Sequence, residues 1–213
     1  MRRLVLTALL GQLATAALAA QGRPPLEQRL DPPTLAALRP ILDSAQGDSV
    51  PVKALEDKAL EGAAKHVPPT RIVSVVRQLA AELRNARALL RSAAPRAVLS
   101  DDETIAAADA RRRGVPATEV SALRSHVPLA TVLVVAYTVL GDLVQRGIPA
   151  SQAREVIEQL IGAGVPASQI AEIPGRMDVG LRVGAPPLDA LRNALPLPLR
   201  PVRRLQPTPP KPN

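Results

Sequence analysis

The stretch that decides the fold is residues 147–168, GIPASQAREVIEQLIGAGVPAS, in which two Gly-aliphatic-Pro corners enclose one helix-forming run. Glycine can adopt the left-handed conformation just past a helix, the aliphatic residue folds back onto the last turn, and proline prevents continuation. A corner of this kind therefore ends one helix and starts the next. Further copies, with His or Ser sometimes replacing Gly, are Ser49-Val50-Pro51, His66-Val67-Pro68, Gly114-Val115-Pro116, His126-Val127-Pro128 and Gly184-Ala185-Pro186.

A hydroxyl residue follows four of the prolines by two positions, as Thr70, Thr118, Ser151 and Ser168. Ser and Thr side chains commonly accept hydrogen bonds from the free amides of a helix N-terminus. We therefore expect these residues to cap the helices that follow. Histidine at the glycine position is also expected to adopt a positive φ, since His visits that region more than most residues.

The corners and the hydrophobic periodicity predict an all-α array or bundle of about eight short helices. No segment alternates as a strand would. Pro40 is expected to break or bend the first helix. The predicted helices cover residues 35–46, 52–65, 71–93, 100–113, 129–140, 151–163, 168–175 and 187–194.

Two segments match more fully, because residues 51–72 align with 149–170 at a shift of 98 with the apolar and proline positions in register. This predicts a duplicated helical-hairpin unit. The run at 129–140, LATVLVVAYTVL, is apolar all round but too short to span a membrane, so we expect a central helix buried by its neighbours.

Charges mark both ends of the helix between these segments. Ser100-Asp101-Asp102-Glu103 has the pattern of a capping box, and Arg111, Arg112 and Arg113 close the helix before Gly114. We interpret the three arginines as complementing the helix dipole; a binding patch is the alternative.

The segment from Val50-Pro51 through Lys53-Ala54-Leu55 and Lys58-Ala59-Leu60-Glu61-Gly62 to Val67-Pro68-Pro69-Thr70-Arg71-Ile72 resembles a group of exported bacterial helical proteins of unknown function. The resemblance covers about a quarter of the chain. It implies export and helical architecture, and no activity.

Residues 1–19 read as a secretory signal peptide, because Arg2 and Arg3 precede an apolar run that ends in small residues before a cleavage site after Ala19. An uncleaved anchor is the alternative, but the run falls short of the ~20 residues of a spanning helix. The chain has no cysteine, which excludes a lipid anchor at the cleavage site. We therefore expect a periplasmic or secreted protein with a flexible lead-in at 20–33 and a helical domain at 34–195.

Residues 196–213 contain seven prolines and four basic residues without an acid, so we expect a basic, disordered, polyproline-like tail. It could contact anionic lipid or cell-wall polymer, dock in an aromatic groove, or remain solvated. The candidate contact residues are Arg200, Arg203, Arg204 and Lys211.

The remaining charge is nearly balanced. Without the four tail residues and the two leader arginines, 21 of the 27 basic residues face 19 acidic ones. This argues against nucleic-acid binding, which favours a basic face. Tyr137 is the only aromatic residue, so stacking sites for sugars or single strands are also disfavoured.

The sequence contains no recognisable catalytic motif. The only histidines, His66 and His126, lie in corners, no nucleophile elbow or phosphate loop occurs, and the acid pairs Glu155/Glu158 and Glu56/Glu61 fit solvated helix faces. We expect no cofactor or metal, and a non-catalytic module that binds a partner protein in the cell envelope. Attachment to an anionic envelope polymer through the tail is the alternative, and a hydrolase is a third; the oligomeric state stays open.

Overall fold

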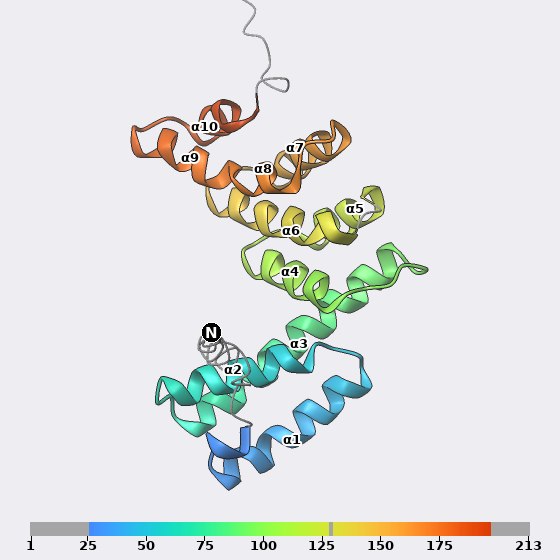
Figure 1. The fold of residues 1–213 in the computed structure, drawn as a ribbon, viewed down its shortest axis with the longest axis vertical. Coiled ribbons are helices and arrows are strands. Elements are labelled where there is room, and N and C mark those ends of the chain that lie inside the picture. Colours follow the sequence, from blue (N-terminus) through green and yellow to red (C-terminus); the bar gives the residue numbers. More distant parts are fainter. Residues whose placement is uncertain (1–25, 128–129, 197–213) are drawn as a thin grey trace, which may run out of the picture.

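The computed structural model describes residues 26–127 and 130–196. It is all-helical over these residues, which confirms the predicted fold class (Figure 1). The elements are η1 (Leu26–Gln28), α1 (Pro32–Gly47), α2 (Val52–Ala64), α3 (Pro69–Ala93), α4 (Asp101–Arg112), α5 (Ala117–His126), α6 (Ala130–Gln145), α7 (Ala150–Gly162), α8 (Ala167–Ala171), α9 (Ile173–Arg182) and α10 (Pro187–Ala194).

The sequence pattern did not predict α5, and it did not separate α8 from α9. α5 fills the space between two corners, and the helix predicted at 168–175 is in fact the end of α8 and the start of α9. The first helix is also longer than predicted. It starts at Pro32, where Asp31 caps it by accepting a hydrogen bond from the Thr34 amide at 2.8 Å. The structure has a short 3-10 turn at Leu26–Gln28 within the predicted lead-in, and Pro40 does not break the helix.

Six of the seven predicted corners have the expected left-handed residue, with φ of 57° at Ser49, 54° at His66, and between 73° and 96° at the four glycines. In each corner the amide of the aliphatic residue donates to the carbonyl five residues earlier, as in Ile148 to Leu143 at 3.1 Å and Val165 to Leu160 at 3.0 Å. This is the six-residue bond of the Schellman motif, so the sequence pattern does close one helix at each of these places.

The seventh corner is different, because His126 is not in the left-handed region. The Val127 amide instead bonds the Leu123 carbonyl four residues earlier, at 3.0 Å. A tertiary contact lies at this end of α5, where the His126 ring is 2.9 Å from Glu158 of α7, and within the turn Arg124 donates to the Val127 carbonyl at 3.3 Å. The expectation for His126 is therefore wrong.

The predicted hydroxyl caps are also wrong. In the six corners whose proline the structure describes, the proline is itself the residue before the helix, with φ between −53° and −60°, and its carbonyl accepts the first helical bond, as in Ala153 to Pro149 at 2.9 Å. Thr70, Thr118, Ser151 and Ser168 consequently lie inside the first turn, and none of these four helices has a side-chain cap.

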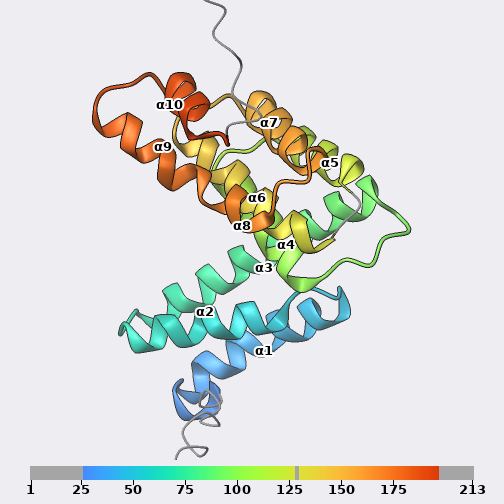
Figure 2. The ribbon, with the colours of Figure 1, turned by 45° about the horizontal axis from the view of Figure 1, so that its top comes forward.

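The helices stack into an elongated two-layer array that runs from α1 at one end to α9 and α10 at the other (Figure 1). Along one layer α1 packs on α3, α3 on α5 and α5 on α7; along the other α4 packs on α6 and α6 on α8. This alternation of neighbours is typical of helical solenoids. The view in Figure 2 shows the same order from a second direction.

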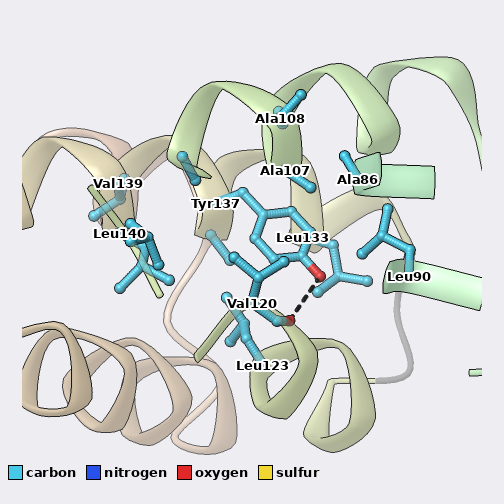
Figure 3. Close-up of a cluster of buried hydrophobic side chains, with 14 of the residues drawn as sticks. Ala86, Leu90, Ala107, Ala108, Val120, Leu123, Leu133, Tyr137, Val139 and Leu140 are labelled. Carbon is cyan, nitrogen blue, oxygen red and sulfur yellow. Dashed lines mark hydrogen bonds between the residues drawn. The ribbon is translucent and has the colours of Figure 1, made fainter. Parts of the chain in front are cut away.

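The core is continuous through the array and contains mostly Ala, Leu, Val and Ile. Its centre lies around α6, where Tyr137 is fully buried and donates a long hydrogen bond of 3.4 Å to the Val120 carbonyl of α5 (Figure 3). Four buried alanines of α4, at 106, 107, 108 and 110, let α6 approach closely. The expected burial of the central helix is confirmed, although it extends to Gln145.

The predicted repeat has a structural counterpart. α2 and α7 begin and end at the same shift of 98 residues, and so do the starts of α3 and α8. Leu55 and Ala59 are buried where their counterparts Ala153 and Ile157 are buried.

The described helices include none with the length and apolar character that crossing a bilayer requires.

Candidate binding groove and buried polar cluster

The second layer of helices has a break between α2 and α4. Both helices pack on α3, but they do not pack along each other as α4 and α6 do. α3 runs diagonally between them, from α2 at its start to α5 at its end (Figures 1 and 2). The break leaves one flank of α3 uncovered over Val75 to Leu89, and we call the hollow along this flank the α3 groove.

The groove has two adjoining parts. The first, of about 300 Å³, lies between α2, α3 and α4, and its apolar surface comes from Ala54, Val75, Leu79 and Ile105. Ile105 is unusual for an isoleucine of this chain, since 37% of it is exposed. An exposed branched aliphatic side chain beside half-buried Leu79 and Val75 is surface that a ligand could cover.

The second part, of about 380 Å³, lies between α3, α4 and the start of α5. Ala86, Leu89, Ala108 and Ala117 supply its apolar surface, and Asn85 lies at its exposed edge. The two parts share Glu82 and Arg112, whose side chains form an ion pair at 3.3 Å. One polar bridge thus separates two apolar hollows along the same helix.

The charged residues that line the groove are mostly basic: Lys58, Arg111 and Arg112 against Glu82. Lys58 pairs with Glu61 at 2.8 Å, and Arg112 pairs with Glu82 and, at 3.6 Å, with Asp109. Arg111 donates to the Val115 carbonyl and has no carboxylate partner among the described residues. It is therefore the groove cation that is free to pair with a carboxylate of a ligand.

A buried ion pair lies next to the groove, in the packing of α4 on α5. Glu103 is fully buried, and its Oε1 lies 2.7 Å from Nε of Arg124, whose side chain is 4% exposed. The N–H bond is not aligned with the oxygen, and neither oxygen of Glu103 has a hydrogen bond within the described chain. Charge alone thus holds the pair together.

Burial raises the pKa of the Glu103 carboxyl above its usual 4.5, and the positive charge of Arg124 and the Ser100 amide only partly oppose that rise. Burial likewise raises the pKa of Tyr137, and the Glu103 carboxylate adds to the rise. Arg87 of α3 reaches the same region, since its Nη1 lies 3.4 Å from the Thr104 hydroxyl. Glu103 lines neither part of the α3 groove.

The capping box is only half right. The Glu103 amide donates to the Ser100 hydroxyl at 3.1 Å. The Ser100 amide lies close enough to lower the pKa of the Glu103 carboxyl, but the carboxylate makes no hydrogen bond of normal geometry within the described chain and its Oε1 faces Arg124. The interpretation of Arg111 to Arg113 as a helix-end cluster agrees with the structure. Arg113 pairs with Asp109 at 2.6 Å and with Asp142 of α6 at 2.5 Å, and Arg111 caps its own corner through Val115.

The remaining candidates for chemistry lie apart. His66 is exposed in its corner, whereas the His126 ring contacts Glu158, which belongs to an ion-paired group with Arg154 and Glu119 between α5 and α7. Glu155 is largely exposed, and Glu61 has its pKa lowered to about 2 by Lys58 and Lys65. The described residues contain no group of three potential metal ligands.

Two further features do not belong to this candidate site. Arg200, Arg203, Arg204 and Lys211, the proposed tail contacts, lie outside the described residues, as does the leader. A larger hollow of about 710 Å³ lies between η1 and α2, two residues after the start of the described chain, and its lining is more polar than that of the α3 groove. We place no site there.

No protein-family model matches the chain, and searches of curated proteins and of solved structures find no match either.

Proposed function

We propose that the chain is an exported, non-catalytic helical module that binds a partner protein in the cell envelope, with the α3 groove as its binding surface. The observation that supports this is the break between α2 and α4, which exposes Ile105 and the flank of α3 in an otherwise continuous two-layer array. Solenoid arrays commonly bind partners along extended surfaces of this kind.

The chemistry of the groove fits a protein ligand better than a small molecule. Its two hollows are open and shallow, whereas small-molecule sites bury most of their ligand. Its surface combines aliphatic patches with charged side chains at the edge, which is the composition of a protein interface. No nucleophile, metal ligand set or acid-base pair converges on it among the described residues.

The proposal is tested with a photoreactive amino acid placed at Ile105, in the cells that make the protein. The matched control carries it at Val183, the residue directly after α9, which is 82% exposed at the far end of the array. We expect a discrete protein adduct from position 105 and none of the same mass from position 183. The adduct should disappear when Asn85→Trp fills the second hollow from its exposed edge.

Identical adducts from both positions, or an adduct at 105 that Asn85→Trp does not affect, would show that the groove is not the binding surface. Far-UV circular dichroism of each variant checks that the helical array is intact.

A further inference from the structure

The spacing and charge of the α3 groove specify the kind of partner segment that it fits. We infer that the groove binds an acidic amphipathic α-helix that carries two apolar anchor residues about 11 positions apart. This inference rests on the proposed function, because it names the ligand class of the same surface.

The first step is the distance between the two hollows. Leu79 lines the first and Leu89 the second, and both lie on one continuous helix. Ten residues of α-helix span about 15 Å, at a rise of about 1.5 Å per residue. A ligand lying along α3 must therefore place its two apolar groups about 15 Å apart.

A helix meets this requirement better than an extended strand. Residues i and i+11 of a helix lie about 16.5 Å apart and, after three turns, on the same face. Side chains of an extended strand at that distance are about five residues apart and point to opposite faces. The groove is also bordered by helices on both sides, so a helix would continue the packing between α2 and α4 that the second layer lacks.

The second step is the polar bridge between the hollows. The Glu82–Arg112 pair already satisfies both charges, at 3.3 Å. A bulky apolar residue above it would desolvate the pair without compensation. The middle of the bound helix should therefore carry a small residue, and its anchors should lie to either side.

The third step is the charge. The lining has three basic residues and one acid, and Arg111 at the second hollow has no carboxylate partner among the described residues. A ligand carboxylate beside its second anchor would pair with this guanidinium. A basic helix would instead face uncompensated repulsion, so charge selects between ligands of equal hydrophobicity.

The test uses the purified full chain and three dye-labelled helical peptides in fluorescence anisotropy. The first peptide has leucines at i and i+11, alanine between them and glutamates at the flanks. The second moves the leucines to i and i+7, and the third replaces glutamate by lysine. We expect the first to bind at least tenfold more tightly than either of the others.

Two protein variants test whether the peptides bind in the α3 groove. Arg111→Glu should weaken binding of the acidic peptide at least fivefold and strengthen binding of the lysine peptide, with Arg111→Gln intermediate. Arg192→Glu makes the same charge change on α10, outside the groove, and should leave both affinities within twofold. Melting curves of all variants confirm that they are folded.

Equal binding of the acidic and lysine peptides, loss of the spacing preference, or no binding of the first peptide would overturn the inference. So would self-association of the chain in sedimentation that Arg111→Glu abolishes, since a second copy would then occupy the groove. Crosslinking from Ile105 that persists while the peptides fail would leave the groove as a binding surface and reject only the helical ligand.

Discussion

Removing one partner of the buried Glu103–Arg124 pair should have very unequal effects. Arg124→Met leaves a carboxylate that is fully buried, has no hydrogen bond and loses its only close countercharge. An uncompensated buried charge costs about 3–5 kcal/mol. Glu103→Gln removes the charge for which burial is already costly. It leaves the buried Arg124 guanidinium without its countercharge, but that group keeps its hydrogen bond to the Val127 carbonyl. The substitution should therefore cost about 1 kcal/mol at neutral pH.

The assay is urea unfolding followed by circular dichroism. With a urea dependence of about 2 kcal/mol per M, Arg124→Met should lower the midpoint by about 1.5–2.5 M and Glu103→Gln by about 0.5 M. The double variant should return to the Glu103→Gln value or above it, because neither charge of the pair is then left buried without its partner.

The pH dependence of stability tests independently whether the charged form of Glu103 is unfavourable in the folded chain. Burial raises the folded-state pKa of Glu103, so the protonated form is relatively favoured by folding. The stability that this contributes is complete below the unfolded value near 4.5 and is lost as pH rises through the folded value. Arg124→Met should therefore recover toward wild type as pH falls from 7 to 4.5. Equal losses for the two single variants, or a wider gap at low pH, would refute this reasoning.

Three further predictions test the corners, the core and the independence of the groove from the tail. Gly164→Ala places a side chain at φ 73° with open space around it and should lower Tm by about 2–4 °C, whereas Gly162→Ala, two residues earlier inside α7 and equally open, should leave Tm unchanged or raise it. Tyr137→Ala should cost about 3–5 kcal/mol in urea unfolding because it opens a cavity between α5 and α6, while Tyr137→Phe should cost under about 1 kcal/mol because the hydroxyl bond is 3.4 Å long. Deleting residues 197–213 should leave the affinity for the acidic peptide unchanged in anisotropy; a loss would favour attachment through the tail.

Features that depend on a few neighbouring residues could be predicted from the sequence. Each Schellman corner joins residues five apart, so a left-handed residue, an aliphatic residue and a proline are enough to identify it. The same locality explains why seven of the eight predicted helices correspond to single helices, whereas the one predicted at 168–175 merges the end of α8 and the start of α9. The short α8 has only five residues, and periodicity does not show its end at Ala171.

Errors arose where tertiary contacts compete with local patterns. Glu103 fits a capping box by position, but it points to Arg124, which lies 21 residues later on α5. His126 resembles His66 in sequence, but only His126 has an acidic partner on a neighbouring helix. The hydroxyl caps failed for a local reason, since the proline already occupies the position before the helix.

The α3 groove could not be predicted, because it joins Ala54, Leu79 and Ile105 from three helices across a missing contact. One sequence signal points to it in retrospect: Ile105 is the only large aliphatic residue in α4, whose buried positions are mostly alanine.

Methyl NMR of the 22.4 kDa chain tests the role of the α3 groove most directly, since aliphatic probes lie both inside and outside it. On addition of the acidic peptide we predict shift changes at Val75, Leu79, Leu89 and Ile105, with Val98, Val179 and Val183 unchanged although 90%, 59% and 82% of these valines are exposed. Largest changes at Val179 and Val183, or no changes at the groove methyls, would contradict the proposed binding surface.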